Sequence, residues 1–271
     1  MRVEGRGSRV ERAVPVGIAR RVVVAASILS VFGAAAVGGT VDARPLTRPV
    51  PAHALAPGPS TPDPRPSSVV SRVSIARLQY DGGGDWYANP SSLPNLLEAV
   101  AERTTLDVDR TEGRVTLLDE RLWEYPFLHV TGHGNIKLSD AEVERLREYL
   151  RRGGFLHVSD NYGLDESFRR EIARVFPDRP LVDVPLSHPI YHLVYDFPNG
   201  VPKIHEHDGK PARGLGIFLG DRLAVFYDYQ CDLGNGWEDP GTYSDPPALH
   251  EAALRMGVNL VVYAVTSRPT S

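Results

Sequence analysis

The chain has 271 residues, of which 42% are hydrophobic and 24% are charged, and this composition is ordinary for a globular protein. Residues 1–71 carry a net charge of +5, so the overall charge of −4 leaves −9 on residues 72–271, and such an acidic body argues against nucleic acid as the main partner. The single cysteine, Cys231, excludes an internal disulfide and every cysteine-based zinc site, which leaves His, Asp and Glu as candidate metal ligands.

Residues 1–43 are predicted to be an export signal or a membrane anchor. Several arginines precede an uncharged apolar run over residues 22–41, and the small residues of Val41-Asp42-Ala43 favour cleavage after Ala43. Arg20-Arg21 also resembles a twin-arginine signal. Cleavage would give a periplasmic or extracellular protein. Without cleavage, residues 22–41 would anchor the chain, because about 20 apolar residues just span a bilayer.

Residues 44–71 are predicted to be a disordered linker. They include Pro-Gly-Pro-Ser-Thr-Pro-Asp-Pro-Arg-Pro at 57–66, which offers almost nothing to bury. Residues 72–271 are enough for a single domain. Membrane contact is therefore expected only through the amino-terminal segment.

Short apolar runs alternate with helical patterns in residues 72–271. Strands are predicted at 73–80, 127–131, 154–159 and 181–184, with a hairpin over 215–229 that turns at Gly220-Asp221. Helices are predicted behind Ser92, from a capping box at Ser139–Glu142 to Gly153, behind Asp165, and from Asp245-Pro246 toward the end. Strands that alternate with helices predict an α/β fold with a mostly parallel central sheet covered on both faces.

Three of these strands end in conspicuous loops, at residues 80–87, 131–135 and 159–163. In an open parallel sheet the ligand crevice lies outside the carboxyl ends of the strands, so the three loops are expected to meet at one edge. Their polar and aromatic side chains are the predicted site residues Asp81, Asp85, Trp86, His133, Asp160 and Tyr162. A nucleotide is not expected there, because Gly82-Gly83-Gly84 lacks the Lys and Ser/Thr of a P-loop.

The histidines of these strands and loops have different expected roles. His133 is a candidate general base or metal ligand, with a residue that only bonds its own loop as the alternative. His129 and His157 lie within apolar strands, which predicts packing roles in the core.

The run Lys203-Ile204-His205-Glu206-His207-Asp208-Gly209-Lys210 concentrates charged side chains in one short segment. In an extended chain both imidazoles would point to the same side, so His205 and His207 are candidate ligands of a divalent metal such as zinc. Glu206 is a candidate for proton transfer, and Lys203 and Asp208 are candidates for binding. We expect an excursion from the regular alternation, which either caps the carboxyl edge near His133 and Asp160 or remains a polar hairpin outside it.

Taken together, these segments resemble the bacterial family called domain of unknown function 4159 over roughly residues 72–266. The resemblance is carried by the motifs at 80–87, 131–134, 160–163, 188–190, 202–209 and 257–259. It implies a class I glutamine amidotransferase-like superfamily, near proteins associated with trehalose utilisation, and with it a flavodoxin-like three-layer sandwich. The superfamily's nucleophilic cysteine would stand where this chain has His133, so hydrolysis of glutamine through a thiol is not expected.

Three functions are compatible with these observations. The first is an exported metal-assisted hydrolase that acts on a saccharide or envelope glycan, with His133, Asp160 and Glu206 as catalytic residues. In this hypothesis a metal that activates water is bound by His133, Asp160, His205 and His207, and protons are transferred by Glu206 or Asp208. The second is a non-catalytic domain that binds a sugar or another small ligand in the same crevice. The third is an interaction module of a membrane-associated assembly. The sequence predicts no oligomeric state.

Overall fold

A single seven-stranded sheet organises residues 72–267, the part of the chain that the computed structural model describes. The strands are β1 Ile75–Leu78, β2 Gly113–Val115, β3 Phe127–Val130, β4 Phe155–Ser159, β5 Val182–Asp183, β6 Arg213–Leu219 and β7 Arg222–Tyr229. Their order is β2-β1-β3-β4-β7-β6-β5. The first five in this order are parallel, whereas β6 runs antiparallel to both β7 and β5. The predicted mostly parallel sheet with an added hairpin is confirmed; the predicted signal and linker lie outside the described residues.

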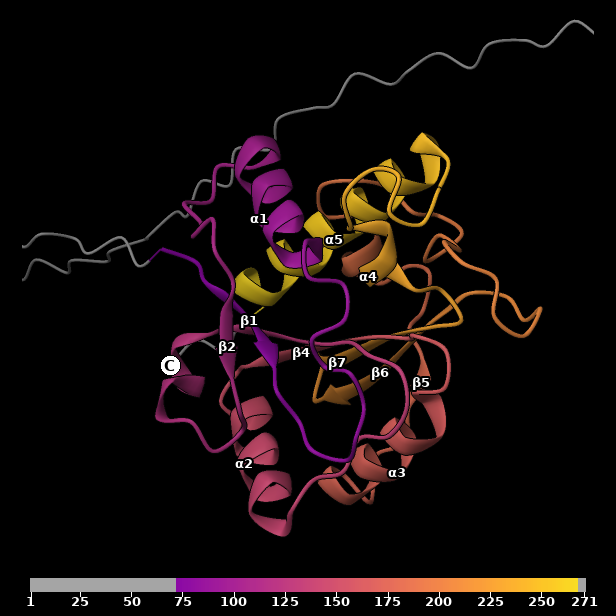
Figure 1. Ribbon diagram of the computed structural model, residues 1–271. Helices are drawn as coiled ribbons and strands as arrows, with labels where there is room; N and C mark the ends of the chain where they lie inside the picture. Colours follow the sequence, from indigo (N-terminus) through magenta and orange to yellow (C-terminus); the bar gives the residue numbers. More distant parts are fainter. Residues whose placement is uncertain (1–71, 268–271) are drawn as a thin grey trace, which may run out of the picture. The chain divides into compact units, whose positions relative to one another are not determined.

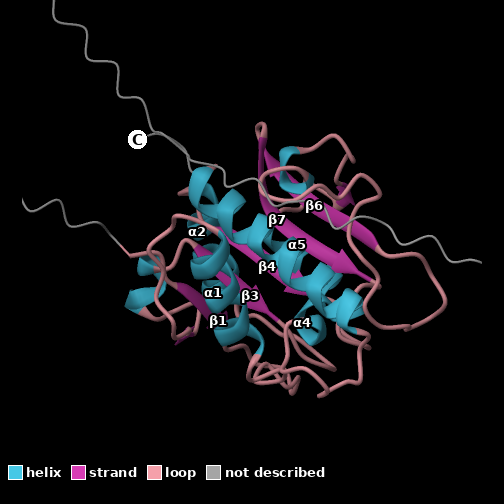
Figure 2. Cartoon of the chain, turned by 90° about the horizontal axis from the view of Figure 1, so that it is seen from above, coloured by secondary structure: helices cyan, strands magenta, loops and turns pink. Residues whose placement is uncertain are grey.

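Helices cover both faces of this sheet. They are α1 Ser92–Arg103, α2 Asp140–Arg151, α3 Asp165–Val175, α4 Leu233–Gly236 and α5 Pro247–Thr266, with 3-10 turns η1 Glu120–Glu124 and η2 Pro189–Tyr191. Helices α1, α4 and α5 lie on one face, and α2 and α3 lie on the other (Figure 1). Figure 2 shows α1, α4 and α5 from above, in front of the strands. Within residues 72–267, no helix is both long and apolar enough to span a bilayer.

The strands divide their side chains between two apolar cores. Phe127 and Phe155 belong to the core that α1 and α5 complete, whereas Leu128 and Leu156 belong to the core that α2 and α3 complete. Each of these side chains is at most 1% exposed, and burying one stabilises the fold by about 1.5–3 kcal/mol. The two cores therefore fix the central strands, and with them the carboxyl edge of the sheet, from both faces.

A local sequence signal explains the start of α2 but not that of α1. The predicted capping box at the start of α2 is confirmed, because Ser139 and Glu142 cap each other's backbone N–H groups. The predicted cap of α1 is wrong by one residue: Ser91 is the cap, and the Ser92 hydroxyl donates to the carbonyl oxygen of Asn89 at 2.7 Å.

Two parts of the sequence prediction are corrected. Strand β2 was not predicted, because its three residues, Gly-Arg-Val, show no apolar alternation. The predicted strand at 181–184 is only the two-residue edge strand β5. The run 203–210 contains no strand, which agrees with the expected excursion from the regular alternation.

The connections after β1 and β3 go to opposite faces of the sheet. Strand β1 leads to α1 on one face, and its neighbour β3 leads to α2 on the other. Such a switch point opens a crevice outside the carboxyl ends of the two strands. The loops at 80–87 and 131–135 lie there, and Asp85 of the first accepts a hydrogen bond from the backbone N–H of His133 in the second.

Candidate functional site

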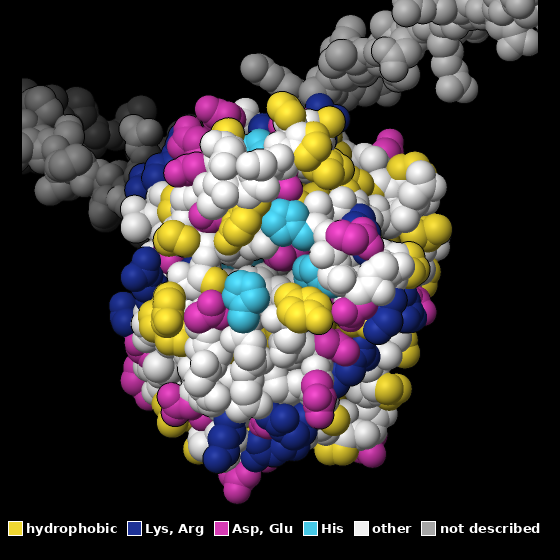
Figure 3. Space-filling view, turned by 45° about the vertical axis from the view of Figure 1, so that its right-hand side comes forward, with side chains coloured by type: hydrophobic (Ala, Val, Ile, Leu, Met, Phe, Trp, Pro, Cys, Tyr) yellow, Lys and Arg dark blue, Asp and Glu magenta, His cyan; other side chains and the backbone are white. Residues whose placement is uncertain are grey.

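An open cleft of about 460 Å³ lies at the carboxyl edge of the sheet. Its lining comes from the loop after β3, the loop after β4, the run 203–210, and the segment from the end of β7 to α5. The lining residues are His133, Tyr162, His205, Glu206, His207, Asp232, Asn235 and Tyr243. Figure 3 shows histidine side chains gathered on one face next to acidic ones.

His207 is the most enclosed histidine of the cleft. Its Nδ1 lies 3.9 Å from Asp160 Oδ2, and its Nε2 lies 3.5 Å from Asp232 Oδ2. All three side chains are at most 5% exposed. The Asp232 carboxylate raises the pKa of His207, and the charge of Asp160 adds to this shift.

His205 is also placed between two carboxylates. Its Nε2 lies 3.0 Å from Asp245 Oδ1, and its Nδ1 lies 3.6 Å from Asp232 Oδ2. Hydrogen bonding to Asp232 is again the main cause of a raised pKa. Asp232 thus serves both imidazoles, and its φ of 65° shows that the backbone turns sharply to present this carboxylate.

Two buried aspartates lie at the carboxyl ends of β4 and β7, Asp160 directly after β4 and Asp228 as the last but one residue of β7. Asp160 Oδ2 accepts a hydrogen bond from the Gln230 N–H at 2.5 Å, while Asp228 Oδ1 accepts one from the Asp160 N–H at 2.7 Å. Burial raises the pKa of Asp160 to about 6 and raises the pKa of Asp228 well above its usual range. Both carboxyl groups can therefore hold or release a proton at pH values where an exposed aspartate cannot.

Backbone hydrogen bonds hold the histidine run against this edge. The carbonyl oxygen of Cys231 accepts the N–H groups of Ile204 and His205 at 3.0 and 3.3 Å. Gln230 forms two further hydrogen bonds with Asp208, one to its backbone N–H and one to its carboxylate. The run therefore caps the carboxyl edge, which is the first of the two placements expected from the sequence.

Residues 74–265 match the model of a family described as "Domain of unknown function (DUF4159)". The chain belongs to this family. A search of curated proteins found no match to the chain.

The DUF4159 domain brings only part of the predicted site together. His133 lines the cleft. Asp85 does not, but its Oδ2 lies 3.1 Å from His133 Nδ1 and holds that ring in place. Asp81 pairs with the backbone of Lys137, and Trp86 packs edge-on against Tyr87. Neither of these predicted binding residues lines the cleft.

The charged residues of the run 203–210 differ in where they point. Glu206 lines the cleft but is 68% exposed, and its carboxylate pairs with Lys203 at 3.0 Å rather than with an imidazole. Asp208 faces a neighbouring hollow with Lys210 and Tyr162. Lys203 lines neither space.

The described residues provide no complete ligand set for the predicted metal centre. Within residues 72–267, no three His, Cys, Asp or Glu side chains are arranged so that they could hold a metal ion. His205 and His207 instead face carboxylates at distances of 3.0–3.9 Å. The metal at these two histidines stays a prediction.

Several residues of the site were not predicted from the sequence. Asn235, Tyr243 and Asp245 come from the stretch between β7 and α5. Asp232 comes from the same stretch, where carboxylates beside Trp237 are compatible by sequence with a sugar site or with a solvated acidic loop. A cluster of acidic and amide residues directly after a strand end was the available signal. In the same stretch, Trp237 is fully buried, so it offers no exposed ring to a sugar.

Proposed function

We propose that the protein is an exported hydrolase that acts on a saccharide in this cleft. The observation that supports this most is the position of His207, with one ring nitrogen facing Asp160 and the other facing Asp232. An imidazole between two carboxylates is suited to proton transfer, and Asp160 is itself shifted toward neutral pH. Export follows from the predicted signal at residues 1–43.

In the proposed reaction, Asp160 and His207 divide the proton transfers. The Asp160 carboxylate takes a proton from water as the water oxygen bonds to the sugar carbon. The imidazolium of His207 gives a proton to the leaving oxygen as the C–O bond breaks, so each product ends in a hydroxyl group. A proton then passes from Asp160 back to His207. Asp160 Oδ2 and His207 Nδ1 lie 3.9 Å apart, which is longer than a hydrogen bond. Inverting glycosidases hold their acid and base groups about 6.5–9.5 Å apart, so the proposed reaction requires the two side chains to separate as the substrate enters.

The remaining cleft residues would position the substrate. Tyr162 is 62% exposed beside His207 and offers a ring face on which a sugar can stack. Asp232 stabilises the imidazolium through its Oδ2. His205, held by Asp245, would donate a hydrogen bond to a sugar hydroxyl group.

We further infer membership in the class I glutamine amidotransferase-like superfamily. This inference is supported by the order of the parallel strands and by the sharp turn at Gly132, whose φ is 130°, directly before His133. Hydrolysis of glutamine is not included in the proposal, because Cys231 is fully buried and burial raises the pKa of its thiol.

A panel of 4-nitrophenyl glycosides tests the hydrolase. Asp160→Asn and His207→Ala are each expected to reduce kcat by at least about 100-fold, the usual scale of acid–base catalysis. Glu148→Gln is the matched control, since Glu148 belongs to an exposed pair with Arg152 on α2, where such pairs contribute little. Equal turnover in the wild type and both site variants would refute the proposal. Activity that chelators remove and zinc restores would assign His205 and His207 to a metal instead.

The pH dependence of kcat tests the division of roles. Asp160 must be ionised, so activity is expected to rise as the pH passes about 6. His207 must be protonated, and its raised pKa places the loss of activity above 6.5. A bell-shaped profile whose acid limb moves in Asp160→Glu is the expected result. A profile that is flat between pH 5 and 8 would contradict these roles.

A further inference from the structure

The cleft is the middle one of three adjoining compartments. Tyr162 and His207 line both the cleft and a compartment of about 290 Å³ at the start of α3. Asn235 and Tyr243 line both the cleft and a third compartment of about 210 Å³. Neighbouring compartments therefore adjoin one another along the carboxyl edge, and we call the three together the groove.

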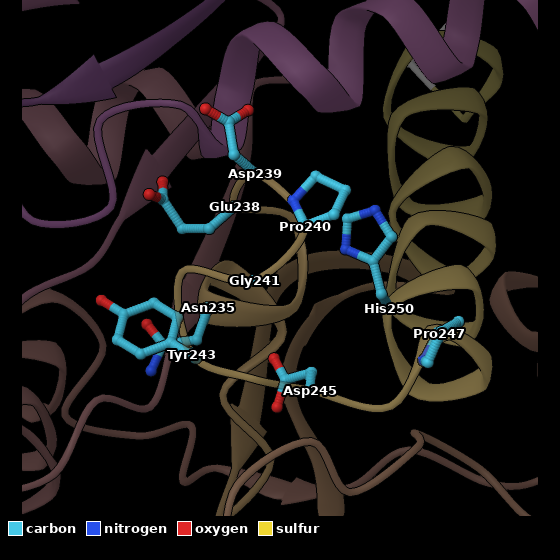
Figure 4. Close-up of a pocket in the computed structure, with 9 residues that line it drawn as sticks. All are labelled: Asn235, Glu238, Asp239, Pro240, Gly241, Tyr243, Asp245, Pro247 and His250. Carbon is cyan, nitrogen blue, oxygen red and sulfur yellow. The ribbon is translucent and has the colours of Figure 1, made fainter.

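The third compartment, shown in Figure 4, lies between the loop after α4 and the start of α5. His250 enters from α5, and Glu238, Asp239 and Asp245 come from the loop. Asp245 also holds His205 in the cleft at 3.0 Å. This compartment is therefore directly coupled to the middle one.

The negative charge of the groove lies mostly in its two outer compartments, because His205 and His207 offset the two carboxylates of the cleft. Carboxylates number four in the compartment at α3, two in the cleft and three in the third compartment. Lys210 is the one lysine or arginine among the described lining residues of all three. An anionic ligand would be repelled, whereas a cationic one would be attracted.

Two buried oxygen atoms in the cleft wall need a hydrogen-bond donor. Asp232 Oδ1 and Asn235 Oδ1 have no partner among the described residues, although the two residues are only 2% and 6% exposed. Native proteins rarely leave buried polar atoms unpaired, and an unpaired acceptor calls for a donor from outside the chain. This need is independent of the net charge, and an ordered water or an N–H or O–H group of a ligand at the cleft wall would meet it.

Aromatic rings are spaced along the same groove. Tyr229 lies in the compartment at α3, Tyr162 stands between that compartment and the cleft, and Tyr243 stands between the cleft and the third compartment. Tyrosine rings pack on the apolar faces of sugars and also attract ammonium groups.

We propose that the groove binds a saccharide chain of at least three units that carries free amino groups. The middle unit occupies the cleft, and its neighbours occupy the two outer compartments. The inference rests on the proposed function in one respect, because the bond that is cleaved then lies beside His207, inside the chain rather than at its end.

Ligand length provides the first test. Glucosamine oligomers with β-1,4 links and one to four units are titrated calorimetrically into the full chain and into Asp160→Asn, which is not expected to turn them over. The Kd is expected to fall by about 100-fold or more from one unit to three and by less than about twofold from three to four. Equal affinity for one and three units would overturn the proposal.

Ligand charge provides the second test. N-acetylated oligomers of the same lengths are expected to bind at least about tenfold more weakly, and only the amino series should weaken as salt is raised. Equal binding of the acetylated series would overturn the assignment of amino groups. A trimer of lysine that binds as tightly as the three-unit sugar would overturn the assignment to a saccharide.

Substitutions in the outer compartments separate this proposal from the hydrolase. Glu166→Gln in one outer compartment and Asp239→Asn in the other are expected to weaken the three-unit ligand by about fivefold each and to leave the single unit unchanged. Glu148→Gln, outside the groove, is the control. Turnover of aryl glycosides without any gain of affinity with length would overturn the groove and leave the hydrolase. Length-dependent binding without any turnover would support the groove and remove the hydrolase.

Discussion

Two pairs of histidines in this protein meet opposite electrostatic conditions. His129 and His157 lie fully buried on neighbouring strands, with their Nδ1 atoms 3.0 Å apart and the ring of Trp237 against both. His205 and His207 lie in the cleft between carboxylates. Burial lowers the pKa of the core pair, to about 3 for His157, whereas carboxylates raise the pKa of the cleft pair.

Burial and a charged partner shift the pKa of a histidine in opposite directions. The side chain of His207 is only 5% exposed, yet its pKa is raised, because hydrogen bonding to Asp232 stabilises the imidazolium. His157 has Asp228 within 3.4 Å, but burial disfavours charge on both groups, because it lowers the pKa of His157 and raises the pKa of Asp228 well above its usual range. The core pair therefore has a packing role, whereas the cleft pair can donate protons.

The largest expected effect is the acid sensitivity of the core pair. Between pH 6.5 and about 3 the unfolded chain binds a proton at His157 that the folded chain does not, so stability falls as the pH falls, by about 5 kcal/mol in total. The cleft pair, with raised pKa values, contributes fully below pH 6.5 and loses its contribution as the pH rises through those values. Urea unfolding of the double variant His129→Leu/His157→Leu should show a much weaker loss of stability in acid than the wild type. Parallel losses would contradict the assignment.

A smaller effect is expected from the ring that covers the core pair. Trp237→Phe removes the hydrogen bond from Nε1 to the carbonyl oxygen of Ala253 at 2.8 Å and leaves a cavity, at a cost of about 2 kcal/mol in unfolding free energy. The pKa values of the cleft histidines, followed by NMR, should not move. Trp86→Phe, at a partly exposed site, is the control and should cost less than about 1 kcal/mol.

Asp232→Asn tests whether one carboxylate raises the pKa of both cleft histidines. Because one carboxylate serves both imidazoles, the pKa values of His205 and His207 should both fall toward the ordinary value in an NMR titration. A fall at only one histidine would show that the shared carboxylate is not the main cause.

The smallest expected effect belongs to Asp245→Asn. Asp245 contacts His205 but not His207, and its contribution to the pKa of His205 ranks behind that of Asp232. The pKa of His205 should therefore fall less than in Asp232→Asn, while the pKa of His207 stays constant. A change at His207 would indicate coupling through Asp232.

Local signals allowed much of the fold to be predicted. The alternation at 215–229 and the capping box at Ser139 depend on neighbours in sequence, and both are found in the structure. The strand-end rule also led from β3 and β4 to His133, Asp160 and Tyr162, which border the cleft and the adjoining compartment. Strand β2 has too few residues to show a period.

The rest of the site depends on contacts that are distant in sequence. Asp232 reaches the two histidines only because its backbone adopts a positive φ, and neither the φ nor the partners follow from its neighbours. Likewise, His205 and Asp245 are 40 residues apart and meet only after α5 packs. Periodicity and composition therefore could not predict the partners of each imidazole, and these partners set its charge.

The burial of Cys231 has a consequence for redox chemistry. Its sulfur is fully enclosed, donates a hydrogen bond to the carbonyl oxygen of Pro202 at 2.6 Å, and has a raised pKa, so the reactive thiolate hardly forms. A lone exposed cysteine would cross-link two copies of a protein in an oxidising compartment. Here the same turn that holds the histidine run also shields the thiol, so oxidation of Cys231 requires that the carboxyl edge first open.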